Sequence, residues 1–199
     1  MADADAHTNH PISITQPMPN PSTNPALLAS LLDKFAAADC CWFASTRPDG
    51  RAHLAPIWHV WHTGAVYVVT KADAVRAENI RHNASVSLSL PDPLNVFVLE
   101  GVARFAPEME EELAPLFQAK YDWDIRTDTK YNAIIAVDPV KAMAWGSHGE
   151  GRWQNLGQSK HPALAHHLDE PEPGVCFEQL SRPPTHHPTR SAIDEGERL

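Results

Sequence analysis

Short apolar segments separated by turn residues fill the middle of the chain, and they constrain its fold more than any other feature. The clearest is SVSLSL, in which Val86, Leu88 and Leu90 alternate with serines. A period of two places successive side chains on opposite faces of a β-strand. Helical patterns interrupt the strands in no repeating βαβ rhythm. The sequence therefore predicts a mainly β domain, a closed or split β-barrel of about six antiparallel strands of Greek-key type, with flanking helices.

Residues 40–70 are expected to form three consecutive antiparallel strands. The segments CCWFAST, AHLAPIWHVW and VYVVT are separated by RPDGR and HTGA, whose Pro, Asp and Gly residues favour turns. Trp58 and Trp61 have opposite parity on the second strand. We therefore expect one of them in the core and the other at a cavity or a partner subunit.

Three helices are expected around this sheet. In the first, Asn24 is the expected N-cap, Pro25 takes the first helical position, and leucines follow at helical spacing. A second helix is expected over about residues 72–81. A third, over residues 107–122, is acidic and is expected to kink at Pro115.

Two later segments are expected to complete the sheet. NVFVLEGVARF is a long strand in which Gly101 marks a β-bulge or a close backbone approach. YNAIIAVDPVKAMAW predicts two short strands that are broken at Asp138 and Pro139.

Proline content divides the chain into one domain and two ends. The 18 prolines gather toward the termini of the 199 residues. We expect residues 1–24 to form a flexible arm, residues 25–155 a single domain, and residues 156–199 a Pro- and His-rich, largely irregular extension.

Charge and hydropathy exclude several classes of partner. A formal net charge of -9, from 25 acidic and 16 basic residues, argues against nucleic acid. No run of 18 apolar residues and no secretion signal occur, so we expect no membrane span and a cytoplasmic location. Cys40, Cys41 and Cys176 show no spacing typical of a disulfide framework or a metal site. A small-molecule substrate is the expected partner.

The 12 histidines raise metal or haem binding as alternatives. His53 and His59 share a strand face, but six residues of strand separate them by roughly 20 Å, too far for one ion. We therefore predict no metal site. A haem-binding protein with His59 or His148 as axial ligand is a separate alternative. No G-x-S-x-G motif and no cysteine in a basic setting occur, so the catalytic residues are unknown.

A cluster of anion-binding residues lies where the third strand is expected to meet the second helix, in TKADAVRAENI. Thr70 offers a hydroxyl, Lys71 an ammonium group and Arg76 a guanidinium group. The N-terminus of the helix would add free N–H groups and the positive end of its dipole. This combination favours a bound phosphate, whereas a strand end with solvated surface charges is the alternative.

Four segments together resemble the flavin-binding split-barrel family of pyridoxamine 5'-phosphate oxidase and its deazaflavin-dependent relatives. They are FASTRPDGRAHLAPIW, VYVVTKADAVRAENIRHNASVSLSL, VFVLEGVARF and DPVKAMAWGSHGEGRW. Their order along the chain is more specific than any one of them. The resemblance implies a homodimer that binds FMN at the subunit interface and transfers hydride to or from a small organic molecule.

The resemblance also implies which residues contact the cofactor. Thr70, Lys71 and Arg76 would bind the phosphate, with Asn79 holding the turn. The isoalloxazine ring would lie against the strand from Leu54 to Trp58. The implied cofactor-binding residues are Leu54, Pro56, Ile57, Trp58, Thr70, Lys71, Arg76, Asn79, Trp145 and Arg152.

Two cofactor alternatives remain open within this fold. The deazaflavin coenzyme F(420) carries a longer acidic tail, which would need a continued basic surface, and the acidic helix at residues 107–122 would repel that tail if it lies beside the binding groove. FMN is therefore the expected cofactor. A non-enzymatic carrier or sensor that binds flavin or haem is the remaining alternative.

Overall fold

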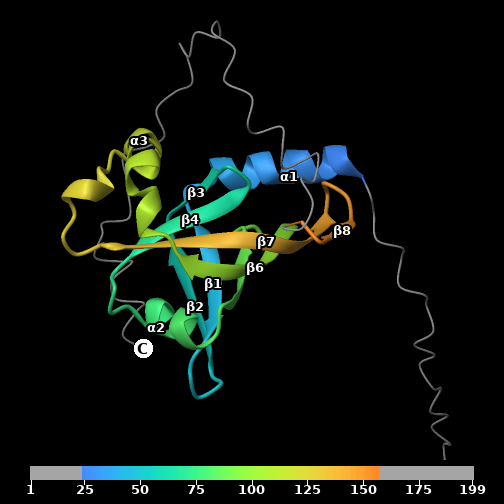
Figure 1. Cartoon of the computed structure of the whole chain (residues 1–199). Helices are drawn as coiled ribbons and strands as arrows, with labels where there is room; N and C mark the ends of the chain where they lie inside the picture. Colours follow the sequence, from blue (N-terminus) through green and yellow to red (C-terminus); the bar gives the residue numbers. More distant parts are fainter. Residues whose placement is uncertain (1–23, 157–199) are drawn as a thin grey trace, which may run out of the picture.

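The computed structural model describes residues 24–156, and Figure 1 shows that they form a strongly curled sheet with helices around it. The expected mainly β split barrel is confirmed, with eight strands in place of about six. None of the helices in this described part is long and apolar enough to cross a membrane. In chain order the elements are α1 (Pro25–Ala37), β1 (Cys41–Thr46), β2 (Ala52–Ile57), β3 (His59–His62), β4 (Ala65–Thr70), α2 (Val75–His82), β5 (Ser85–Ser89), β6 (Asn95–Phe105), η1 (Pro107–Met109), α3 (Glu110–Tyr121), η2 (Ile125–Thr127), β7 (Ala133–Gly146) and β8 (Gly151–Gln154).

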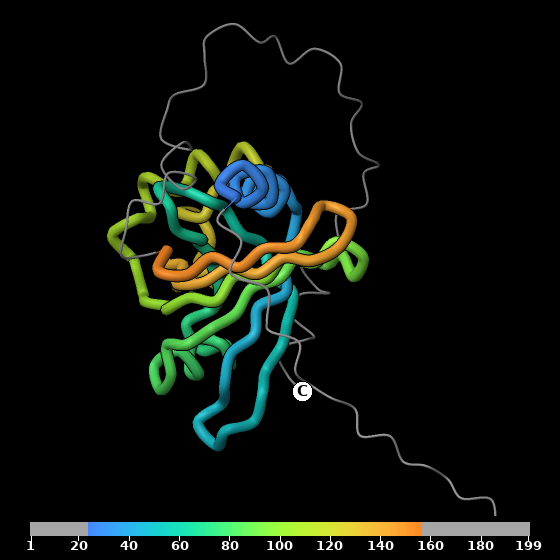
Figure 2. The backbone as a smooth tube through the Cα atoms, turned by 90° about the vertical axis from the view of Figure 1, so that its right-hand side faces the viewer, coloured from blue at the N-terminus to red at the C-terminus, as the bar shows by residue number. Residues whose placement is uncertain are grey.

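The strand order is β2-β1-β5-β6-β7-β4-β3, and β8 also pairs with β7. All of these pairings are antiparallel. β7 joins two groups of strands, β2-β1-β5-β6 on one side and β4-β3 on the other. β6 lies along one edge of β7, while β4 and β8 share the other edge. In Figure 2 the hairpin of β1 and β2 extends away from α1, to the opposite side of the sheet.

Trp58 divides the segment that was expected to form one continuous strand. β2 ends at Ile57 and pairs with β1, whereas β3 begins at His59 and pairs with β4. The predicted three-stranded meander is therefore wrong, because β2 and β4 are not neighbours. β2 and β3 are instead the two ends of the strand order, and a single residue links them. The sheet must curl into a barrel for those two ends to approach so closely.

Gly101 marks the main irregularity of the sheet, as the sequence predicted. The register between β6 and β7 shifts at Glu100 and Gly101, with Pro139 opposite Gly101 and Lys141 opposite Glu100. A Cβ atom at Gly101 would lie 2.7 Å from the carbonyl oxygen of Asp138. The predicted break at Asp138 and Pro139 is thus a β-bulge inside one continuous strand, where proline needs no ladder N–H.

α1 fills the concave side of the curled sheet. Asn24 caps it as predicted, since its side-chain oxygen accepts a hydrogen bond from the backbone N–H of Leu27 at 3.1 Å, and Pro25 is its first residue. One face of the helix is fully buried against the inward residues of β1, β4, β5, β6 and β7. The helical members of this core are Leu28, Leu31, Leu32 and Phe35.

α3 covers the opposite face of β3, β4 and the first half of β7. Leu113, Phe117 and Tyr121 bury their side chains there against a second apolar cluster. This half of the sheet is therefore covered on both faces. Trp61 packs against the first cluster and Trp58 against the second, so the two tryptophans lie on opposite faces as their parity predicts, but both are only partly buried and neither belongs to the fully buried core.

Candidate functional site

The predicted phosphate-binding residues Thr70 and Arg76 meet in a buried polar cluster beneath α2. Arg76 Nη1 donates a hydrogen bond to Thr70 Oγ1 at 2.9 Å, and the two residues are 1% and 0% exposed. Asn79, one turn further along α2, donates to Ser45 Oγ on β1 at 2.9 Å. The end of β4 and the inner face of α2 thus bring together three of the four residues implied for the phosphate, with Ser45 added.

α2 begins at Val75, three residues later than expected. Residues 72–74 form a turn, in which the Ala72 N–H donates to Asn132 Oδ1 and the Ala74 N–H donates to the Lys71 carbonyl. The N-cap is Ala74, which provides no side-chain hydrogen bond to the first turn. Without a polar N-cap, the positive end of the helix dipole points toward the same region as Arg76.

Lys71 directly follows Thr70 at the end of β4 and contacts a different element. Its Nζ is 5.6 Å from the centre of the Tyr131 ring, a cation–π distance. Lys71 is half-buried, whereas Thr70 and Arg76 are enclosed. The predicted phosphate ligands therefore divide into an enclosed pair and a partly exposed ammonium group.

Four other predicted site residues lie on the outer, convex face of the sheet. One transverse row runs from Pro56 through Trp42, Ser89, Val98 and Met143 to Arg152, each residue paired with the next. Leu54 is 59% exposed and Trp145 is 49% exposed, both on this face.

Ile57, which alternates with Leu54 and Pro56, points inward and belongs to the core. Within one chain, the structure does not bring the outer-face residues together with the cluster beneath α2.

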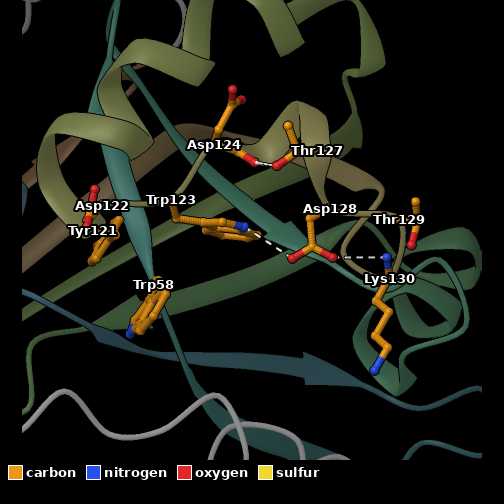
Figure 3. A pocket seen from close by; sticks show the side chains of 9 residues that line it. All are labelled: Trp58, Tyr121, Asp122, Trp123, Asp124, Thr127, Asp128, Thr129 and Lys130. Carbon is orange, nitrogen blue, oxygen red and sulfur yellow. Dashed lines mark hydrogen bonds between the residues drawn. The ribbon is translucent and has the colours of Figure 1, made fainter.

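Trp58 lines a pocket of about 520 Å³ at the C-terminal end of α3 (Figure 3). Its ring stacks on Tyr121 with centroids 4.8 Å apart and planes 4° apart, and Trp123 lies edge-on to it at 6.0 Å. The pocket is lined by Trp58, Tyr121, Asp122, Trp123, Asp124, Thr127, Asp128, Thr129 and Lys130.

The carboxylates of this pocket already have protein partners. Asp128 accepts hydrogen bonds from Trp123 Nε1 at 3.1 Å and from the Lys130 N–H at 3.0 Å, as Figure 3 shows. Asp124 pairs with Arg126 at 2.8 Å, and that guanidinium group holds the pKa of Asp124 below its usual range. With three carboxylates and one lysine in its lining, the pocket favours neutral or cationic groups over a phosphate.

A second polar network holds the C-terminal end of α1. His59 Nε2 is 2.8 Å from the Phe35 carbonyl oxygen, and Lys120 Nζ donates to the carbonyls of Ala36 and His59 at 2.7 and 2.9 Å. Tyr121 Oη accepts from the His59 N–H at 3.0 Å. Burial lowers the pKa of His59 to about 3 and that of Lys120 to about 8. These side chains satisfy carbonyls that the end of a helix leaves without intrahelical partners.

Comparison with known proteins agrees with this architecture. The sequence profile of pyridoxamine 5'-phosphate oxidase matches residues 28–146, more than half of the chain. The chain belongs to the pyridoxamine 5'-phosphate oxidase family. No curated protein sequence matches it closely enough to count as a relative.

Solved structures add support for the split-barrel fold of this family. A protein from Clostridium acetobutylicum, related to general stress protein 26 and placed in the pyridoxinephosphate oxidase family, is 12% identical, with 66% of this chain and 96% of that chain covered and a TM-score of 0.54. General stress protein 26 from Bacillus anthracis is 15% identical, with 64% and 98% covered and a TM-score of 0.51. A haem-binding protein from Mycobacterium smegmatis is 16% identical, with 74% and 61% covered and a TM-score of 0.56.

Two members of the cluster beneath α2 were missed in the sequence. Ser45 and His53 are opposite one another on β1 and β2, and both are buried. Their parity was a usable signal, because Phe43 precedes Ser45 by two residues, and Ala55 and Ile57 follow His53 at the same spacing. The residues that the family resemblance implies on β2 are Leu54, Pro56 and Ile57, and His53 is not among them.

Proposed function

We propose that this family member binds FMN between two copies of the chain and transfers hydride to or from a small organic molecule. The observation that carries the proposal is the Arg76–Thr70 hydrogen bond in the cluster beneath the uncapped N-terminus of α2. Buried charge-assisted donors and a helix N-terminus are the groups that bind a phosphate monoester. When bound, the flavin supplies the hydride chemistry, and the chain positions it.

Because the cluster beneath α2 is enclosed, a phosphate can reach it only at a cost in free energy. A phosphate that reaches Arg76 must enter beside β2, whose outer edge pairs with no other described strand, or displace the turn at residues 72–74. We therefore propose that Lys71, which is half-buried, makes the first electrostatic contact, and that Arg76 and Thr70 hold the phosphate afterwards.

The exposed outer face of the sheet supports the homodimer. Trp42, Leu54 and Trp145 are all more than 40% exposed on β1, β2 and β7. In contrast to the face beneath α3, no described helix covers this surface. Large apolar patches of this kind mark protein interfaces, and a second copy would also bring the outer-face residues of the predicted site into contact with a partner. Light scattering should give twice the chain mass of 22.0 kDa, and Trp42→Asp should shift the protein toward monomer.

The pocket at Trp58 is our proposed position for the organic substrate, beside the strand on which the ring is expected. Its carboxylates also favour FMN over the deazaflavin coenzyme F(420). A tail of several glutamates would meet Asp122, Asp124 and Asp128 if it ran along this pocket. For haem, His59 is a poor axial ligand, because it is fully buried and its Nε2 faces the Phe35 carbonyl at 2.8 Å.

The experiment compares FMN with riboflavin, which lacks the phosphate. Arg76→Met retains the buried stem of the side chain and removes its charge, so it should weaken FMN binding by roughly tenfold to a hundredfold and leave riboflavin binding unchanged. Arg104→Ala, which removes an exposed arginine paired with Glu108 and Asp138, is the control. Equilibrium dialysis gives both affinities, and an absorption spectrum of the purified protein identifies any cofactor already bound.

If wild-type protein binds FMN and riboflavin equally well, the phosphate site is wrong. Tight, salt-sensitive binding of F(420) with weak binding of FMN would replace FMN with the deazaflavin.

A further inference from the structure

His53 is a buried histidine whose imidazole makes no hydrogen bond within the described structure. It lies on β2 opposite Ser45, and the two residues are 5% and 6% exposed. Neither Nδ1 nor Nε2 of His53 has a partner among residues 24–156. Ser45 is in turn hydrogen-bonded to Asn79, so His53 adjoins the cluster beneath α2 from the side of the barrel edge.

Such a side chain is costly in a folded protein. A neutral imidazole has one N–H donor and one acceptor nitrogen, and burying either without a partner costs stability. Natural cores avoid such groups or use them for a ligand. An apolar side chain at position 53 would bury no polar atoms, so burial alone does not explain a histidine at this position.

We propose that His53 is a further phosphate-binding residue, and that binding of a phosphate monoester is accompanied by uptake of one proton from solvent on its imidazole. This inference rests on the proposed function, because it concerns the same phosphate. It goes further by assigning a ligand on β2 and a proton that binds together with the cofactor.

The charges around His53 make the uptake depend on the anion. Among residues 24–156, the charged groups that act on it are Arg76 from α2 and Arg47 from the turn between β1 and β2, while Ser45 and Asn79 contribute only neutral groups. Burial, then Arg76 and then Arg47, lower the pKa of His53, so the imidazole is neutral in the free chain at neutral pH. A phosphate dianion between these groups reverses the local field and favours the protonated form, which donates from both nitrogens.

Proton uptake by His53 also distinguishes between FMN and the deazaflavin coenzyme. A monoester such as FMN carries up to two negative charges, which can compensate both Arg76 and a protonated His53. A phosphodiester such as that of F(420) carries one. The proton-linked site therefore favours the monoester.

Isothermal titration calorimetry tests the proposal on the full chain. FMN is titrated at pH 7.5 in two phosphate-free buffers of different ionisation enthalpy, and the difference in observed enthalpy gives the number of protons taken up. We expect an uptake of between about half and one proton for FMN, and none for riboflavin. His53→Gln can still donate a hydrogen bond but cannot titrate, so it should abolish the uptake and weaken FMN binding by about tenfold. His82→Gln, an exposed histidine at the end of α2, should behave as wild type.

The outcomes separate this inference from the function on which it rests. If FMN binds more tightly than riboflavin but its proton uptake is zero, or is unchanged in His53→Gln, the role of His53 is refuted and the phosphate site stands. Equal binding of FMN and riboflavin refutes both. Should His53→Gln fail to fold, zero proton uptake by the wild type still refutes the role of His53, and His53→Leu, which also cannot titrate, takes the place of the glutamine variant.

Discussion

His53 and His59 are both buried histidines near the end of the strand order, yet their surroundings differ. His59 Nε2 lies 2.8 Å from the Phe35 carbonyl, its backbone N–H donates to Tyr121, and its own carbonyl accepts from Lys120. Within the described residues 24–156, Nδ1 is the one ring nitrogen of His59 without a partner, whereas both ring nitrogens of His53 lack one. The same residue type thus serves in one region to hold α1 on the sheet and in the other, by our proposal, to receive a ligand.

This difference shows that a buried polar side chain with hydrogen-bond partners and one without them have different roles. A network whose members satisfy one another stabilises a particular packing, and its loss should lower stability without affecting ligands. A buried group without partners lowers stability in the free protein, and its presence is explained by what binds to it. The following changes separate the two cases, beginning with the largest expected effect.

Acidification should weaken the fold chiefly through His59. Its pKa is lowered to about 3 in the folded chain, so below about pH 6.5 the unfolded chain takes up a proton that the folded chain does not. Stability is therefore unaffected above that pH and falls as pH decreases, by about 3 kcal/mol between pH 6.5 and 4. Urea unfolding at several pH values measures the slope of the unfolding free energy against pH. His59→Gln should flatten it, and a slope unchanged in that variant would contradict the assignment.

Replacing His59 with leucine should cost about 1 to 2 kcal/mol at pH 7, because the buried carbonyl of Phe35 loses one of its two hydrogen bonds and keeps only that from the Ala38 N–H. The measurement is again urea unfolding, with comparable m-values required for the comparison. FMN and riboflavin binding to the folded variant should not change. A selective loss of FMN binding would show that the α1 network also supports the cofactor site.

Replacing His53 with leucine should have the smallest effect on stability, between no change and a gain of about 1 kcal/mol, since no hydrogen bond is lost. The same variant should lose FMN affinity. A higher unfolding midpoint with weaker FMN binding is the expected pattern when a binding group is retained at the expense of stability. A loss of stability as large as that of His59→Leu would remove the distinction between the two histidines.

Much of the fold follows from local patterns in the sequence. Asn24 and Pro25 mark the start of α1, the alternation around Val86 and Leu88 defines β5, and Gly101 lies at the bulge. These features depend on residues close together in the chain, so they can be predicted directly from the sequence.

Features that depend on distant residues could not be predicted in the same way. The segment on both sides of Trp58 has the composition of one strand, and only pairing with β1 and β4 divides it. The enclosure of Arg76 and the burial of His53 have the same origin. A charged residue in the first turn of a helix resembles a surface residue until the opposite strands bury it.

The central position of β7 has a consequence for the order in which the protein folds. β3 and β4 form a local hairpin, and β1, β2, β5 and β6 can pair among themselves, but only β7 bonds to both groups. As the ribosome delivers the chain from its N-terminus, residues up to Phe105 can form two separate pieces of sheet, with the long edge of β6 still unpaired. Closure of the barrel must wait for residues 133–146, and pairing over such sequence separations is slow. A nascent or truncated chain that ends before β7 is therefore the form most exposed to edge-to-edge aggregation.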